Sequence, residues 1–141
     1  MFAYVPQDFL LLSGSVLENI TLFEEEPDME RFKAAVKMAE CEEVIDALPD
    51  GIDTFLGEGG GRLSGGQRQR MAIARALYSR AQVLLMDEST SALSADTEEK
   101  ILHHLCHSGR TVIFVTHRDT VSALCDRVLH MQDGKITLQH E

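Results

Sequence analysis

The sequence of 141 residues lacks the patterns by which a chain enters or crosses a membrane. It has no apolar run of the roughly 18 to 20 residues that a transmembrane helix needs. Its first residues also lack the basic and then apolar pattern of a secretory signal. We therefore expect any connection to a membrane to come through a partner or through a segment outside this sequence.

Basic residues are in short supply. Thirteen Lys and Arg residues stand against 23 Asp and Glu residues, which gives a formal net charge of -10. A protein that binds nucleic acid usually presents a broad basic surface to the phosphates. The charge balance therefore argues against a nucleic-acid partner.

Cysteine is also scarce. Cys41, Cys106 and Cys125 are odd in number, widely separated and contain no CxxC pair. This pattern fits reduced thiols in a reducing compartment better than a disulfide framework.

The stretch around which the chain is organised runs from Arg62 to Arg70. Ser64 is a good N-cap and Gln67 stands three residues later, so a capping box predicts that a helix begins here. Gly65 and Gly66 leave the backbone open to a ligand, and the positive end of the helix dipole favours an anion such as phosphate. An ordinary capped helix after a flexible glycine loop is the alternative interpretation.

A second pattern lies downstream. Val83 to Met86 is an unbroken apolar run that ends in Asp87 and Glu88, which predicts a parallel strand buried on both faces with acids at its carboxyl end. Open α/β sheets bind ligands at that end. Thr111 to Thr116 predicts a second buried strand, and His117 follows it.

The string Leu63-Ser64-Gly65-Gly66-Gln67 resembles the signature motif of the ATP-binding-cassette (ABC) ATPases. In that family the motif contacts the phosphate of ATP held by the opposite subunit of a head-to-tail dimer. The resemblance implies that these five residues bind ATP in trans and that a second nucleotide-binding domain is a partner.

Three further motifs of the family have counterparts here. Tyr4-Val5-Pro6-Gln7 resembles the Q-loop, whose glutamine reaches the magnesium and the water near the terminal phosphate. The run ending in Asp87 resembles the Walker B motif, and Glu88 resembles the catalytic glutamate that follows it. The resemblance implies Mg²⁺ ligation by Asp87, directly or through water, and by Gln7. It also implies general-base catalysis by Glu88, assisted by Gln7 and by His117, which resembles the switch histidine.

The residues after Glu88 resemble the D-loop with one departure. Ser94 stands where the family usually has aspartate, which weakens the expectation of the usual contact across the dimer. Asp96 is expected to cap the helix that follows. In that helix His103 and His107 share a face, so a metal pair is conceivable, but without a third ligand we interpret them as structural.

Two stretches resemble exporter-type ABC domains in particular. One runs from Leu10 to Ile20, a region that lies close to the membrane-spanning partner in those proteins. The other runs from Leu48 to Thr54 and continues into Gly57-Glu58. The resemblance implies the transmembrane domain of an exporter as a partner and a place at the cytoplasmic side of the cell membrane.

One motif of the family is missing. ATP binding there uses a phosphate loop of the form GxxxxGK followed by Ser or Thr. The only Gly-Lys here, Gly134-Lys135, precedes Ile136. We therefore predict an α/β fold: an incomplete P-loop NTPase (ABC ATPase) core with parallel strands plus a helical subdomain. Residues 1–7 would end a core strand and form the Q-loop, 8–80 the helical subdomain with the signature motif, and 81–141 the later part of the core.

Local patterns predict the remaining elements. Helices are expected over about residues 15–20, 28–47 with a break near Cys41, 64–79, 96–107 and 120–125. Strands are expected over 1–5 and 127–131, with a hairpin turn at Asp133-Gly134 leading into 135–138. An edge and a face of the sheet should stay uncovered, so we expect the isolated chain to self-associate.

The predicted function is that of an ATP-binding and ATP-hydrolysing subunit or domain of an exporter-type ABC transporter, which couples ATP hydrolysis to transmembrane transport. The present chain is expected to be inactive alone because it has no phosphate loop. The alternative is a non-enzymatic interaction module that docks on a transmembrane or nucleotide-binding partner. A soluble ABC ATPase of DNA repair is a third interpretation, which the exporter-like stretches and the negative charge oppose.

Overall fold

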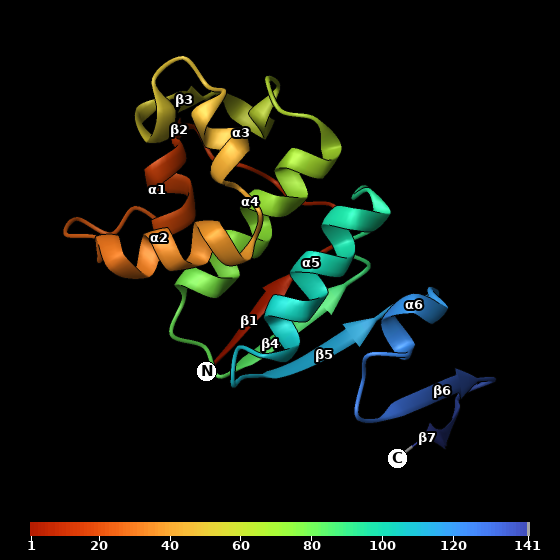
Figure 1. Cartoon of the computed structure of the whole chain (residues 1–141). Helices are drawn as coiled ribbons and strands as arrows, with labels where there is room; N and C mark the ends of the chain where they lie inside the picture. The colour runs from red at the N-terminus through yellow and green to blue at the C-terminus, as the bar shows by residue number, and fades with distance from the viewer. Residues whose placement is uncertain (141) are drawn as a thin grey trace.

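A three-stranded parallel sheet forms the centre of the computed structural model, which describes residues 1–140 (Figure 1). The strands are β1 (Phe2–Val5), β4 (Val83–Asp87) and β5 (Thr111–Val115), in the order β1-β4-β5. The predicted α/β class with parallel strands is confirmed. Within residues 1–140, no helix is both long and apolar enough to cross a lipid bilayer.

The part of the sequence between β1 and β4 forms helices and short strands. They are β2 (Gly14–Ser15), α1 (Val16–Thr21), α2 (Met29–Met38), α3 (Glu42–Asp46), the 3₁₀ helices η1 (Gly51–Asp53) and η2 (Glu58–Gly60), β3 (Phe55–Leu56) and α4 (Gly65–Tyr78). The predicted break near Cys41 is confirmed, because α2 and α3 are separate helices and Glu40 between them has a positive φ of 54°. Both α1 and α2 pack against α4, which is the longest of these helices.

Helix α4 begins as its sequence predicts. The Ser64 hydroxyl accepts a hydrogen bond from the backbone N–H of Gln67 (3.2 Å), and the Gln67 side chain accepts one from the backbone N–H of Ser64 (2.9 Å). This is the reciprocal capping box. Beyond the cap, Met71 and Ile73 are buried in the core.

Helix α5 (Ala95–Cys106) corrects one detail of the sequence interpretation. Its N-cap is Ser94 and not Asp96, because the Ser94 hydroxyl accepts the backbone N–H of Thr97. Asp96 lies in the first turn, where a carboxylate suits the helix dipole, and pairs with Lys100 at 3.0 Å. The residue that departs from the family motif thus has a capping function of its own.

The two faces of the sheet differ, which confirms the expected uncovered face and corrects the expectation, drawn from the apolar run alone, of a strand buried on both faces. Val5, Leu84 and Met86 point toward the helices and are at most 1% exposed. On the opposite face, Ile113 and Val115 are about half exposed, because no described element covers them. We call this side the open face. The strand that carries Asp87 is central, so the unpaired edges belong to β1 and β5.

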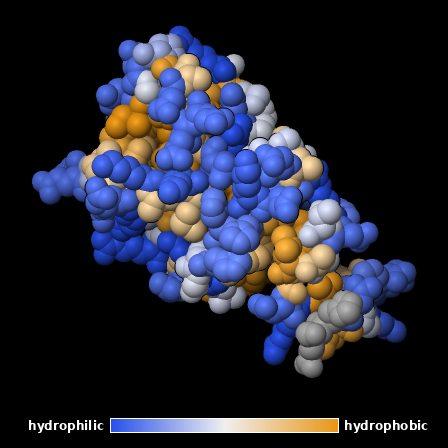
Figure 2. Space-filling model, in the orientation of Figure 1, coloured by the Kyte–Doolittle hydropathy of each residue, from blue (hydrophilic) through white to orange (hydrophobic). Residues whose placement is uncertain are grey.

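The chain ends in a hairpin set apart from the main sheet (Figure 1). After the short helix α6 (Asp119–Ser122), β6 (Val128–Gln132) and β7 (Lys135–His140) pair only with each other. Apolar side chains of the hairpin are exposed: Leu129, Met131, Ile136 and Leu138. Hydrophobic residues are visible around this end of the molecule in Figure 2, and a second group is visible at the upper left, in the helical region, with hydrophilic residues between them.

Candidate functional site

Three predicted site residues meet at the carboxyl end of the parallel sheet. Asp87 ends β4, and Glu88 continues the pairing because its backbone N–H donates to the carbonyl of Val115 at 2.9 Å. His117 follows β5, and its Nε2 lies 3.0 Å from Oε1 of Glu88. The carboxylate of Glu88 is mostly covered, whereas the His117 ring is almost fully exposed.

The backbone of Glu88 is unusual. Its φ is +45°, in the left-handed region that residues with a Cβ atom seldom adopt. Such positions cluster at functional sites, where the surrounding structure holds the backbone in place. Here the ladder bond to Val115 on one side and the turn through Ser91, whose N–H donates to the Glu88 carbonyl, hold it.

Asp87 has a neighbour, Tyr4, to which the sequence motifs assign no role of its own. The Tyr4 hydroxyl donates a hydrogen bond to Oδ2 of Asp87 at 2.9 Å. Tyr4 pairs with Leu85 in the parallel register, so its ring lies on the open face and reaches Asp87 diagonally. The hydrogen bond to the Asp87 carboxylate, with smaller effects of desolvation and charge, raises the pKa of the Tyr4 phenol.

Gln7 lies two residues beyond the end of β1 and therefore at the same end of the sheet. Within residues 1–140, its side chain makes no hydrogen bond to Asp87 or Glu88. Gln7 instead lines a cavity of about 310 Å³ together with Gly65, Gln69 and Ser91. This cavity joins the Q-loop-like turn to the start of α4.

The five signature residues divide between the core and the surface. Leu63 is 5% exposed and packs in the core, while Ser64 and Gln67 form the cap of α4. Gly66 has a packing reason as well: a Cβ atom there would lie 2.8 Å from the backbone oxygen of Ala92. The structure therefore accounts for this glycine without a ligand, and Gly65 is less constrained.

Residues outside the predicted set hold the D-loop-like turn in place. Nε2 of Gln69 donates to the Ser91 hydroxyl at 3.1 Å, and Oε1 of Gln69 accepts from the backbone N–H of Ala92 at 2.9 Å. From the other side, Arg118 donates to the carbonyl of Ser91 at 3.1 Å and to the buried Glu98 at 2.6 Å. The turn thus connects α4 with the residue next to His117. Only the spacing of Gln69 after the signature string could have indicated this role.

Two arginines of α4 join this helix to other parts of the helical region. Arg70 donates to the carbonyl of Glu40 at 2.9 Å, and Arg75 donates to the carbonyl and to the side chain of Asn19. The Arg75 guanidinium also stacks on the ring of Phe9, 4.5 Å from its centroid. Phe9 and Arg75 line the largest of the cavities described, about 550 Å³, between β1 and the helices.

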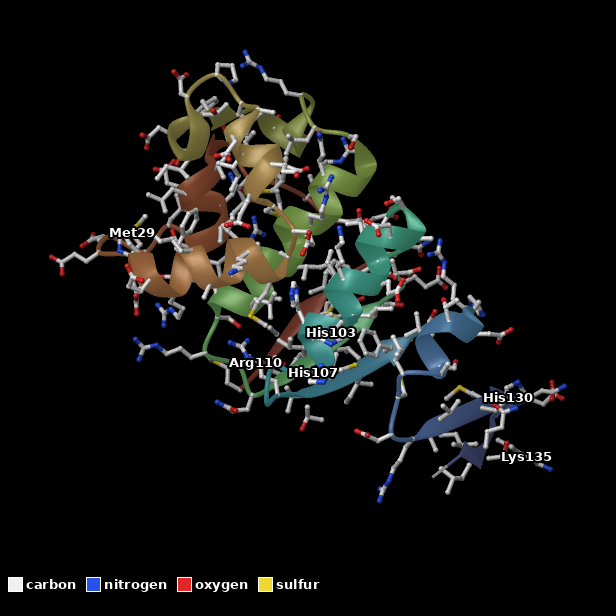
Figure 3. The ribbon with its side chains drawn as sticks, in the orientation of Figure 1. Met29, His103, His107, Arg110, His130 and Lys135 are labelled. Carbon is white, nitrogen blue, oxygen red and sulfur yellow. The ribbon has the colours of Figure 1, made fainter. Side chains whose placement is uncertain are left out.

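His103 and His107 of α5 contact each other and the helix backbone. The rings of His103 and His107 stack with centroids 4.3 Å apart near the carboxyl end of the helix (Figure 3). Nδ1 of His107 lies 2.8 Å from the carbonyl of His103, so that nitrogen is already engaged. Among residues 1–140, no group of three or more His, Cys, Asp or Glu side chains is arranged to hold a metal ion.

Comparison with known proteins agrees with these motifs. The sequence model of the family described as ABC transporter matches residues 1–91. An uncharacterised ABC transporter ATP-binding protein of Bacillus subtilis is 42% identical over 133 residues, which cover 94% of this chain and 23% of that protein. An ATP-dependent lipid A-core flippase of Burkholderia pseudomallei is 42% identical over 136 residues, covering 95% of this chain and 23% of the flippase.

A solved structure extends the likeness to the fold. A bacterial Atm1-family ABC exporter with ATP bound superposes with a TM-score of 0.88 at 38% identity, covering 96% of this chain and 24% of that chain. The present chain thus spans about a quarter of the length of the proteins that it matches. Together with the order of the motifs along the sequence, these matches show that the chain belongs to the ABC transporter family.

Proposed function

We propose that this chain is the later part of the ATP-binding and ATP-hydrolysing domain of an exporter-type ABC transporter. The observation that carries the proposal is the meeting of Asp87, Glu88 and His117 at the carboxyl end of a parallel sheet, in a chain of this family. On this proposal residues 1–7 are the end of a core strand with the Q-loop, 8–80 the helical subdomain and 81–141 the later core.

Each side chain of the site has a proposed role in ATP hydrolysis. Glu88 accepts a proton from the attacking water, and His117, 3.0 Å from Glu88, hydrogen-bonds to the terminal phosphate and keeps the carboxylate in position. Gln7 helps to orient the same water. The short distance between His117 and Glu88 favours roles in one reaction.

The oxygen donors at this end of the sheet fit Mg²⁺. This ion prefers hard oxygen ligands and is held by few protein groups, in agreement with a half-buried Asp87 and the absence of a larger ligand cluster in residues 1–140. Asp87 and Gln7 would hold it, directly or through water. The bound ion would neutralise charge on the phosphates.

Residues Leu63 to Gln67 are proposed to contact the phosphate of an ATP held by a second nucleotide-binding domain in a head-to-tail dimer. The backbone N–H groups at the start of α4 and the helix dipole suit an anion there. The chain itself has no GxxxxGK loop, so we expect no turnover by the chain alone.

The transmembrane domain of an exporter is the proposed second partner, which would place the chain at the cytoplasmic side of the membrane. The apolar and basic cavity lined by Phe9, Leu22 and Arg75 supports this. Phe9 directly precedes the exporter-like stretch of residues 10–20, and Leu22, close behind it, is 55% exposed.

Calorimetric titration with MgATP tests the assignment. The chain is compared with a longer form that also carries a phosphate loop, and only the longer form is expected to bind. Tight binding by the present chain would mean that other residues supply the phosphate contacts. In the longer form, Glu88→Gln should abolish hydrolysis and leave ATP binding largely intact, whereas full turnover in that variant would refute the role of Glu88.

A second candidate function is that of an interaction module that acts without catalysis. The open face favours it, because Phe2, Ile113 and Val115 are 48 to 67% exposed on one side of the sheet. We expect the isolated chain to self-associate through this face. Light scattering over a range of concentrations tests this, and a sharp monomer peak at every concentration would remove the idea.

A further inference from the structure

We propose that Tyr4 is a positioning residue for the metal-binding carboxylate of Asp87. The inference rests on the proposed function, in which Asp87 holds Mg²⁺, and adds a residue for which neither the motifs nor the comparisons give a role. Tyr4 itself touches neither the metal nor the phosphates on this proposal. It acts through Asp87.

The geometry comes from the parallel register of β1 and β4. Tyr4 pairs with Leu85, and Asp87 stands two residues further along β4, so both side chains emerge on the open face. The phenol reaches across one strand and donates to Oδ2 of Asp87 at 2.9 Å. Within residues 1–140, the other oxygen, Oδ1, accepts no hydrogen bond from the protein, so it is free to face a metal ion or its water.

The chemistry of such a contact is orienting. A carboxylate at the end of a strand can rotate about its side-chain bonds, and a fixed donor on one oxygen restricts that rotation. Hydrogen bonds of this kind to metal ligands typically change metal affinity by about 10- to 100-fold when they are removed. The contact also gives the two oxygens of Asp87 different roles. Oδ2 accepts the hydrogen bond from Tyr4, and Oδ1 faces the metal ion or its water.

The chain contains a matched control. It has only two tyrosines and no tryptophan. The second tyrosine, Tyr78, also donates its hydroxyl to a carboxylate, that of Glu24, but lies at the end of α4 among the helices. Tyr4→Phe and Tyr78→Phe therefore each remove one phenol-to-carboxylate hydrogen bond, and only the first involves Asp87; Tyr78→Phe also removes the acceptor of the Asp28 backbone N–H.

The experiment measures binding of Mn²⁺, used as a spectroscopic substitute for Mg²⁺, in the presence of ATP by electron paramagnetic resonance of the free ion, with the longer form that also carries a phosphate loop and with its variants. The difference between the wild type and Asp87→Asn defines the Asp87-dependent site. Tyr4→Phe should weaken binding to that site by about tenfold, while Tyr78→Phe should leave it within about twofold. An unchanged or tighter site in Tyr4→Phe would overturn the proposal.

A second measurement uses the wild-type chain and so does not depend on the folding of a variant. Substoichiometric Mn²⁺, added with ATP to the wild-type longer form, should broaden the ring resonances of Tyr4 in the proton NMR spectrum more strongly than those of Tyr78, which lines the same cavity. A sharp Tyr4 signal while the Asp87 site fills would overturn the positioning role alone. Equal Mn²⁺ binding by the wild type and Asp87→Asn would instead refute the metal role of Asp87, and with it the part of the proposed function on which the inference rests.

Discussion

The helical region, residues 16–78, and the carboxyl region, residues 111–140, have similar apolar side chains but very different cores. In the helical region, Ile20 and Ile73 are fully buried. In the carboxyl region, Ile113 is 49% and Met131 71% exposed. In the helical region, apolar side chains therefore pack against one another within the region. In the carboxyl region, apolar side chains of the sheet and the hairpin are left exposed, and only another surface could bury them.

The largest effect expected from this comparison is on stability. Ile73→Ala removes a fully buried side chain and should lower the free energy of unfolding by about 2 to 5 kcal/mol. At protein concentrations where the chain is monomeric, Ile113→Ala should cost less than about 1 kcal/mol, since half of that side chain is already in water. Urea denaturation followed by circular dichroism measures both. Equal losses would show that the open face is covered in solution.

The contact between the start of α4 and the D-loop-like turn should give the next largest effect. Gly66→Ala places a Cβ atom 2.8 Å from the backbone oxygen of Ala92. Overpacking of this kind costs about 1 to 3 kcal/mol, offset by up to about 1 kcal/mol of helix propensity. The control is Gly61→Ala, where a Cβ atom meets nothing within 4 Å. If both variants melt alike, the contact with Ala92 is not tight.

The helical region should also respond to alkaline pH. Burial raises the pKa of the Cys41 thiol to about 12, above its ordinary value near 9. The unfolded chain therefore loses this proton first, so stability is complete below about pH 9 and falls as the pH rises toward 12. The loss should be about 1.4 kcal/mol at pH 10. In Cys41→Ala this part of the pH dependence should disappear, and an unaltered alkaline slope would contradict the assignment.

The smallest effect on stability is expected from removing the N-cap of a helix. Two helices, one in each half of the chain, can be compared in this way. Ser64→Ala and Ser94→Ala each remove a hydroxyl that accepts a backbone N–H, at Gln67 and Thr97 respectively. Each should cost about 1 kcal/mol. Thermal unfolding of both variants measures the difference. A negligible loss for Ser94→Ala alone would mean that α5 is held by its packing and not by its cap.

The sequence predicted well those features that depend on residues close together in the chain. The capping box at Ser64 and Gln67 correctly predicted the start of α4, and the apolar run before Asp87 correctly predicted a strand. The burial of that strand could not be predicted from its own residues, and the uncovered face was expected only because the sequence has no phosphate loop. An apolar run indicates that a side chain is able to be buried, but whether it is buried depends on which elements cover it.

The candidate site shows the same division. Asp87, Glu88 and His117 could be named because they resemble motifs of the family, and their places at the ends of strand-like runs predicted that they lie at one edge of the sheet. The contact of Tyr4 with Asp87 depends on the register between β1 and β4, which are separated by almost 80 residues. The contact of Gly66 with Ala92 likewise joins distant segments. Local patterns carry no information about such register, so these contacts required the folded structure.

The left-handed backbone at Glu88 has a consequence for how the chain can evolve. Glycine adopts a φ of +45° without strain, and asparagine does so more readily than glutamate. Folding stability alone would therefore favour replacement of this glutamate. On the proposed function, the role of the carboxylate in hydrolysis offsets this cost in stability. Glu88→Gly should therefore make the folded chain more stable, even though it removes the proposed general base.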